Sequence, residues 1–144
     1  MRFGIKSLAL IAATTLMAPM AFADEVGNAE EGENVFKKCK ACHKIGEGAE
    51  NGTGPMLNDV MGRVAGTVPD FSYSDDLVAA GAAGLVWDAE TISGFIEDPK
   101  KFLRDYLDDK GAKSKMTLKL KKDEERADVI AYVATFSAPP AASQ

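Results

Sequence analysis

The chain has 144 residues, of which 46% are hydrophobic and 27% are charged, and its formal net charge is −5. This length and composition predict a single soluble, globular domain. The negative charge gives the protein no electrostatic reason to bind the phosphates of nucleic acid.

Residues 1–23 have the pattern of a secretory signal peptide. Arg2 and Lys6 precede an apolar run at residues 8–16, and Ala21-Phe22-Ala23 forms a small-residue cleavage site. An uncleaved membrane anchor is the alternative, but the run is too short to cross about 30 Å of hydrocarbon. We therefore predict export to the periplasm and a mature chain that starts at Asp24. The mature chain is more acidic because it lacks both basic residues.

The period of the apolar residues favours helices, and no alternating pattern of a β-sheet protein stands out. The first predicted helix begins after Asn28, which can cap it, and carries Glu30 and Glu31 in its first turn. Its apolar face repeats at steps of three and four residues, at Gly32, Val35, Phe36 and Cys39. This helix leads directly into the segment that holds both cysteines.

A long connection, residues 44–72, is rich in glycine and contains Pro55 and Pro69. This composition predicts loop, and loops of such length in a compact domain usually serve a function. The loop has too few large apolar residues to form a core by itself. We therefore expect it to wrap around an organic cofactor.

Three further helices are predicted between residues 74 and 111. Their starts are residues that cap helices well, namely Ser74 or Asp75, then Asp88, then Asp98 before Pro99. The first runs through Ala80 and is ended by Gly81 or Gly84, and the third continues until Gly111. The buried stripe of the middle helix consists of Ile92, Phe95 and Ile96.

Residues 112–120 form a second predicted loop, and the last helix follows it. Asp123 is the predicted cap of this helix, and its apolar side is Val129, Ile130, Tyr132, Val133 and Phe136. The predicted domain therefore spans residues 24–136, and residues 137–144 are expected to be a disordered tail. The fold is expected to be all-α, with four to five short helices and long loops around one cofactor.

Both cysteines and the only histidine lie in one pentapeptide, Cys39-Lys40-Ala41-Cys42-His43. Cys-x-x-Cys-His is the attachment pattern of c-type haem. On a helical turn the two thiols face the same way and can each add to a vinyl group, while the imidazole projects toward the iron. We therefore predict one haem c attached through Cys39 and Cys42, with His43 as an iron ligand.

Four other chemistries use similar residues. A zinc site needs four ligands, but this chain has only two cysteines and one histidine. A copper electron-transfer site needs two histidines, and the chain has one. A thioredoxin-like pair follows a strand, and here a predicted helix precedes the motif. A structural disulfide, the default pairing in an exported protein, would leave the long loops without a core.

Because the chain has no second histidine, the second axial position of the haem iron is left to a methionine, a lysine, a water molecule or no ligand. Met56 and Met61 follow His43 closely, in the segment expected to cover the histidine side. Met116 lies far downstream in a polar loop, where an exposed thioether is unusual, and such a long excursion of the chain can reach the opposite face. The alternative for Met116 is a gap-filling role between helices.

With these residues in place, the sequence resembles the class I cytochromes c, most closely the bacterial cytochromes c2. The resemblance covers nearly all of the predicted mature chain. The similar segments, in order, are Gly32 with Phe36, Cys39 to His43, Thr53-Gly54-Pro55, Gly62-Arg63, Phe71-Ser72-Tyr73, Trp87, Asp98-Pro99-Lys100-Lys101, Met116 and Val129-Ile130-Ala131-Tyr132.

The resemblance implies a class I cytochrome c fold, with His43 and Met116 as axial ligands of a covalently bound haem. It implies that the Pro55 carbonyl accepts a hydrogen bond from the second His43 nitrogen. It also implies that the first and last helices cross closely at Gly32, and that the haem propionates are held by Tyr73, Trp87, Arg63 and Ser114. Two departures concern the methionine side: Phe95 replaces a tyrosine of mitochondrial relatives, and extra residues occupy about 104–112.

If His43 and Met116 occupy both axial positions of the iron, no site remains for a substrate. We therefore predict an electron carrier and not an enzyme, with no catalytic residue and no small-molecule substrate. The expected partners are membrane complexes such as a cytochrome bc1 complex and a reaction centre or terminal oxidase, served by a monomer. Lysines flank the motif and the methionine loop and predict a positive face around the haem edge: Lys37, Lys38, Lys40, Lys44, Lys100, Lys101, Lys113, Lys115, Lys119, Lys121 and Lys122. The alternative function is a five-coordinate haem protein that binds a gas or a peroxide.

Overall fold

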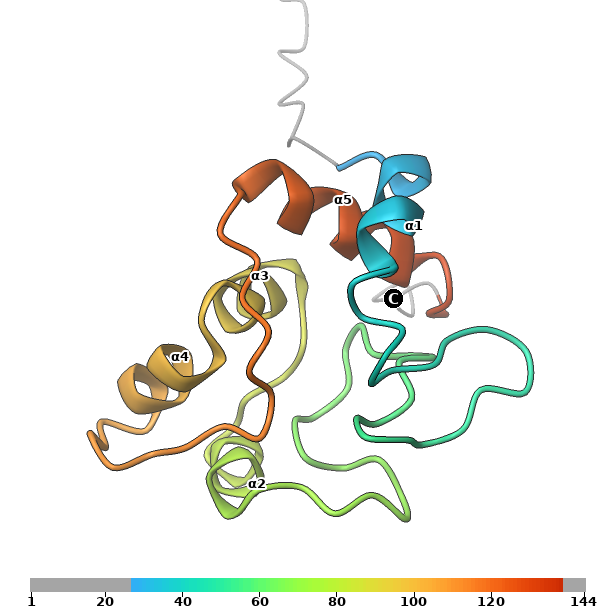
Figure 1. The fold of residues 1–144 in the computed structure, drawn as a ribbon. Coiled ribbons are helices and arrows are strands. Elements are labelled where there is room, and N and C mark those ends of the chain that lie inside the picture. The colour runs from blue at the N-terminus through green and yellow to red at the C-terminus, as the bar shows by residue number, and fades with distance from the viewer. Residues whose placement is uncertain (1–26, 139–144) are drawn as a thin grey trace, which may run out of the picture.

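The structure, a computed structural model, describes residues 27–138 and contains five helices in that range. The predicted signal peptide and residues 139–144 lie outside the described residues. The helices are α1 (Ala29–Phe36), α2 (Asp75–Ala82), α3 (Ala89–Glu97), α4 (Pro99–Tyr106) and α5 (Asp123–Ala134) (Figure 1). In residues 27–138 the β pairing is limited to an isolated bridge between Val64 and Val86. The expected all-α fold is therefore confirmed.

The first and last helices pack against each other although they lie at opposite ends of the chain (Figure 1). A Cβ atom on Gly32 would lie 2.0 Å from the Asp128 carbonyl oxygen and 2.8 Å from Cβ of Tyr132. Next to this contact, the rings of Phe36 and Tyr132 have centroids 5.3 Å apart. The predicted close crossing at Gly32 is thus confirmed, because no larger residue fits between these backbones.

Four of the predicted helix caps are confirmed. The side chains of Asn28, Ser74, Asp88 and Asp98 each accept a hydrogen bond from a backbone N–H in the first turn of the helix that follows. Asp88 and Thr91 form a reciprocal capping box at the start of α3. These local signals fix where α1 to α4 begin.

Two predicted helix boundaries are wrong, and at a third only one of the two predicted alternatives is confirmed. α2 continues through Gly81, whose missing Cβ leaves room for the Ala65 carbonyl oxygen 1.9 Å from the Cβ position, and ends at Ala82, just before the left-handed Gly84 with φ of 103°. α4 ends at Tyr106 and not at Gly111, because Asp108 takes a left-handed backbone conformation with φ of 49°. The N-cap of α5 is Lys122, which makes no side-chain cap, and the predicted cap Asp123 instead pairs with Arg126.

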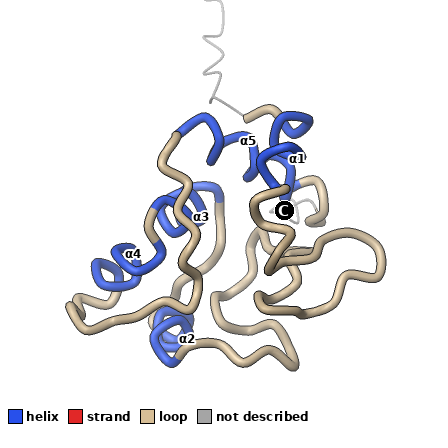
Figure 2. Tube along the Cα trace, viewed as in Figure 1, coloured by secondary structure: helices blue, strands red, loops and turns tan. Residues whose placement is uncertain are grey.

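Two long coils connect the helices. Figure 2 shows residues 37–74 on one side of the molecule and the coil between α4 and α5 on the other, alongside α3. The predicted tail begins with residues that touch the body: Ser137 Oγ accepts from the Met61 N–H at 3.2 Å, and the Ala138 N–H donates to Asp59 at 3.1 Å. Among residues 27–138, none of the helices has the length and hydropathy needed to cross a membrane.

Candidate functional site

A cavity of about 340 Å³ lies between the two coils and brings distant parts of the chain together. The coil that follows α1 contributes Cys39, Cys42 and His43 to its lining, and the coil between α4 and α5 contributes Met116. The rest of the lining is largely apolar and comes from the helices, the first coil and the connection between α2 and α3, including Leu57, Val60, Leu77, Trp87, Ile92, Phe95, Ile96, Val129, Ile130 and Val133. All four predicted site residues thus line one cavity.

The pentapeptide forms a tight helical turn directly after α1. The Cys42 N–H and the His43 N–H both donate to the Cys39 carbonyl oxygen, at 3.0 and 2.9 Å. This turn brings all three side chains to the same cavity. The two cysteines are not joined to each other. Two thiols and an imidazole on one turn match what attachment to a single porphyrin needs.

The His43 ring is held in one orientation by the segment Gly54-Pro55. Its Nδ1 lies 2.7 Å from the Pro55 carbonyl oxygen. A carbonyl only accepts, so Nδ1 carries the proton and the lone pair lies on Nε2, the nitrogen available to a metal. A Cβ on Gly54 would lie 2.4 Å from Cε1 of this ring, so the ring packs directly on the backbone.

Protonation of the site suits a metal ligand and not a redox pair of cysteines. Burial lowers the pKa of His43, with a further contribution from Arg63, despite the hydrogen bond to Pro55 that raises it. The imidazole is therefore neutral at neutral pH and free to donate its lone pair. Burial raises the pKa of Cys39 to about 11, whereas a thioredoxin-like cysteine needs a lowered pKa.

Met116 is the methionine that lines the cavity; Met56 and Met61, the other sequence candidates, do not. The Met116 N–H donates to Ser114 Oγ at 3.1 Å, which shapes the backbone just before it. Met61 and Met116 both pack against the hydrophobic core, but Met61 does not line the cavity. The thioether of Met116 thus reaches the cavity from a segment 73 positions after the histidine in sequence.

The charged side chains that line the cavity are all basic, although the protein as a whole is acidic. Lys38, Arg63 and Lys115 are part of the lining, and no aspartate or glutamate in the described part of the chain is. Tyr73, Trp87 and Ser114, which the resemblance relates to the propionates, line it as well. Arg63 also donates to the Met56 and Asn58 carbonyl oxygens at 3.3 and 3.2 Å. Such a lining suits a flat apolar group that carries carboxylates.

A zinc ion finds no comparable set of ligands. Across residues 27–138, no three His, Cys, Asp or Glu side chains gather closely enough to hold a metal ion. Two thiols for covalent attachment, one imidazole, one thioether and an apolar pocket with basic groups fit a haem, and each of these groups faces the same cavity.

Sequence reasoning missed the contacts that hold residues 112–121, here called the methionine segment, in place. Lys115 Nζ donates to the Ser72 carbonyl oxygen at 2.8 Å, and the Lys113 N–H donates to Asp76 at 2.8 Å. Farther along, Asp98 binds Lys119 at 2.7 Å. These partners lie 21 to 43 positions apart, so no local pattern in the sequence signals them.

The comparisons with known proteins agree with this site. The sequence model of the family described as "Cytochrome c" matches residues 29–137. Cytochrome c-551 of Roseobacter denitrificans is 51% identical over 138 residues, which cover 92% of this chain and 96% of the relative. Cytochrome c2 iso-1 of Rhodospirillum centenum is 50% identical over 117 residues, which cover 77% of this chain and 98% of the relative.

Solved structures show the same fold. The structure of cytochrome c2 from Rhodospirillum centenum superposes with a TM-score of 0.75 at 45% identity, over 78% of this chain and all of that chain. The structure of cytochrome c2 from Rhodobacter capsulatus gives a TM-score of 0.69 at 46% identity, over 76% and 97%. The chain therefore belongs to the cytochrome c family: it is a class I c-type cytochrome, similar to the cytochromes c2, and carries one covalently attached haem c.

Proposed function

We propose that this electron-transfer cytochrome carries single electrons through a haem whose iron is bound by His43 and Met116 and whose porphyrin is anchored by Cys39 and Cys42. The observation that carries the proposal is the cavity itself. One turn after α1 and one loop before α5, far apart in sequence, meet at a single apolar pocket with an imidazole and a thioether.

The haem supplies the one-electron chemistry, and this chain's residues tune and protect it. Pro55 holds the proton on Nδ1 of His43, so Nε2 is the ligating atom. The thioether of Met116 is a weak donor and favours the reduced state. The apolar lining excludes water and keeps the reorganisation between the two states small. If His43 and Met116 both bound the iron, no ligand position would remain for a substrate, so we propose a carrier rather than an enzyme.

We further propose the periplasm as the site of action, reached by cleavage after residue 23, and a monomeric domain of residues 24–136 followed by a short tail. The proposed partners are membrane redox complexes, such as a cytochrome bc1 complex and a reaction centre or terminal oxidase. The protein would bind these complexes with the basic rim of the cavity, formed by Lys38, Arg63 and Lys115, facing the partner.

The visible and near-infrared spectra of the purified protein test this proposal. We expect a narrow reduced α-band and, in the oxidised protein, the weak near-infrared feature of methionine ligation. Met116→Ala should abolish the near-infrared feature. Met56→Ala is the matched control, because Met56 does not line the cavity, and should retain it.

A near-infrared feature that survives in Met116→Ala would refute the assignment of Met116. A reduced spectrum of the wild-type protein that shifts on addition of carbon monoxide would support the five-coordinate alternative instead. A colourless protein, exported in a strain able to attach haem, would overturn the whole proposal.

A further inference from the structure

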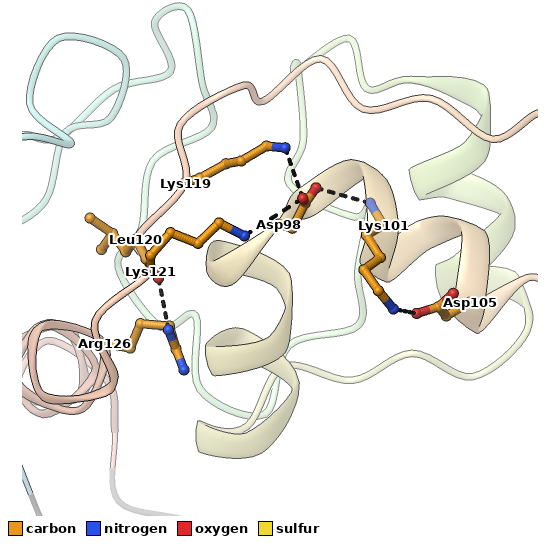
Figure 3. Close-up of polar contacts among 7 residues, drawn as sticks. All are labelled: Asp98, Lys101, Asp105, Lys119, Leu120, Lys121 and Arg126. Atoms are coloured by element: carbon orange, nitrogen blue, oxygen red, sulfur yellow. Dashed lines mark hydrogen bonds and ion pairs between the residues drawn. The ribbon is translucent and has the colours of Figure 1, made fainter.

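The segment that follows Met116 crosses the junction between α3 and α4, where Asp98 lies. Figure 3 shows the Asp98 carboxylate between this segment and the first turn of α4. Its Oδ2 lies 2.7 Å from Nζ of Lys119 and 3.7 Å from Nζ of Lys121. Its Oδ1 accepts from the Lys101 N–H at 3.1 Å. One oxygen thus caps the helix, and the other binds the methionine segment.

The backbone between the two lysines is fixed from both sides. The Leu120 N–H donates to the Ile96 carbonyl oxygen at 2.8 Å, and its carbonyl accepts from Arg126 Nη1 at 2.8 Å. Leu120 itself is buried. Lys119 lies only three positions after Met116, so a Met116 that withdraws from the cavity must pull against the Asp98–Lys119 pair.

The carboxylate is charged in neutral solution. Lys119, followed by the Lys101 N–H, holds the pKa of Asp98 at about 2. The side chains of Lys119 and Lys121 are 47% and 59% exposed, so salt can screen their attraction to Asp98.

We propose that Asp98 is a positioning residue for Met116: its ion pairs with Lys119 and Lys121 hold the segment after the methionine and limit how readily the thioether leaves the cavity. The proposal rests on the proposed ligation by Met116. It predicts that Asp98 controls access of an external ligand to the methionine side without contacting that ligand.

Asp98→Asn isolates this role. An asparagine oxygen caps helices about as well as aspartate, so the capping hydrogen bond to Lys101 is kept while the ion pairs are lost. Asp105→Asn is the matched control, because it removes the same charge from α4, the helix that Asp98 caps. Asp105 pairs with Lys101 and does not contact the methionine segment (Figure 3).

Binding of imidazole to the oxidised holoprotein, followed by visible absorption, measures how readily Met116 is displaced. At low salt we expect Asp98→Asn to bind imidazole about threefold more tightly than the wild type, the scale of an exposed ion pair. Asp105→Asn should match the wild type. At about 1 M salt, where the Debye length is about 3 Å, the difference should shrink. Equal affinities of D98N and D105N at low salt, or an undiminished difference at high salt, would overturn the proposal.

A double-mutant cycle provides a second test. Lys119→Gln should also tighten imidazole binding, and adding it to Asp98→Asn should change the affinity by less than the sum of the two single effects. Fully additive effects would contradict a direct pair between these residues. Met116→Leu separates the two proposals: unchanged imidazole affinity in this variant would refute ligation by Met116. A large gain there, with D98N equal to D105N, would refute only the role of Asp98.

Discussion

Gly54 determines how closely the chain packs against the proposed proximal ligand. It lies next to Pro55, whose carbonyl binds Nδ1 of His43 at 2.7 Å, and its own N–H donates to the Cys42 carbonyl oxygen at 2.8 Å. The three ring atoms nearest to a Cβ at this position would lie 2.4 to 2.8 Å away. The glycine is thus required by steric contact, and the ring cannot keep its place beside any larger residue.

We expect Gly54→Ala to destabilise the holoprotein by about 1–3 kcal/mol, the usual cost of overpacking. The His43 ring must move away from Pro55 to make room for the methyl group. Gly52→Ala is the control, since a Cβ there meets only the Cys42 carbonyl oxygen at 3.5 Å, an ordinary contact. Denaturant unfolding measures both variants. Equal free energies of unfolding for the two would show that the ring has room to move.

Buried Arg126 joins three separate parts of the methionine side. Its guanidinium binds the Leu120 carbonyl oxygen, Ser93 Oγ at 3.1 Å, and Asp123. Arg126 is only 8% exposed, so its buried positive charge is stabilised by these partners rather than by water. The arginine therefore fixes the start of α5 relative to α3 and to the segment that follows Met116.

At the scale of elements, the contact between α1 and α5 closes the fold. The segments joined are the two ends of the described chain, and the pentapeptide follows α1 directly (Figure 1). Asn28 adds a polar contact, since its N–H donates to the Asp128 carboxylate at 2.7 Å. The position of the haem attachment turn therefore depends on how closely these two helices approach.

We expect Gly32→Ala to destabilise the protein by at least about 1 kcal/mol, although alanine favours helix by about 1 kcal/mol over glycine. The clash is with backbone atoms of α5, which cannot move aside without separating the helices. Gly94→Ala in α3 is the matched control, because its Cβ would meet only the Phe102 ring at 3.1 Å. Thermal unfolding compares the two. A Gly32→Ala variant as stable as Gly94→Ala would contradict the close crossing.

Local signals predicted the elements better than their ends. A helix cap depends on a few adjacent residues, and the structure confirms the caps at Asn28, Ser74, Asp88 and Asp98. The start of α5 could not be predicted this way, because Asp123 binds Arg126 rather than the helix terminus. The early end of α4 likewise depends on a left-handed residue, Asp108, for which aspartate is only one of several permitted types.

The site residues also differ in how far the sequence alone predicts their positions. Cys39, Cys42 and His43 share one turn, so their proximity follows from the sequence alone. Met116 could be named from its unusual polar surroundings, but its place in the cavity depends on contacts with residues 72, 76 and 98. Those pairings arise only when the whole chain is folded.

At the scale of the molecule, basic side chains gather at the cavity although the protein as a whole is acidic. The chain carries a net charge of −5, yet within residues 27–138 the charged residues that line the cavity are three bases. Several of the lysines predicted to form a positive face are partly neutralised by carboxylates, namely Lys38, Lys101, Lys119, Lys121 and Lys122. The proposed docking face therefore depends most on basic residues at the cavity, such as Lys115, and on their neighbours, such as Lys113.

Small inorganic oxidants of opposite charge separate the local field from the net charge. At about 0.1 M salt the Debye length is about 10 Å, so a reagent at the cavity senses mainly the basic rim. We expect oxidation of the reduced protein by anionic ferricyanide to slow as salt rises from about 0.1 to 0.5 M, and oxidation by cationic tris(1,10-phenanthroline)cobalt(III) not to slow. A protein that acted through its net charge would show the opposite dependence on salt.

Single lysines locate the rim. Lys113 adjoins Ser114 and Lys115, which line the cavity, whereas Lys110 lies in the turn after α4 and neither lines the cavity nor adjoins a lining residue. Lys113→Gln and Lys110→Gln remove the same charge, so they change the net charge equally. We expect only Lys113→Gln to weaken the salt dependence with ferricyanide, because screening acts on charges near the reagent. An equal effect of both variants would place electron exchange away from the cavity mouth.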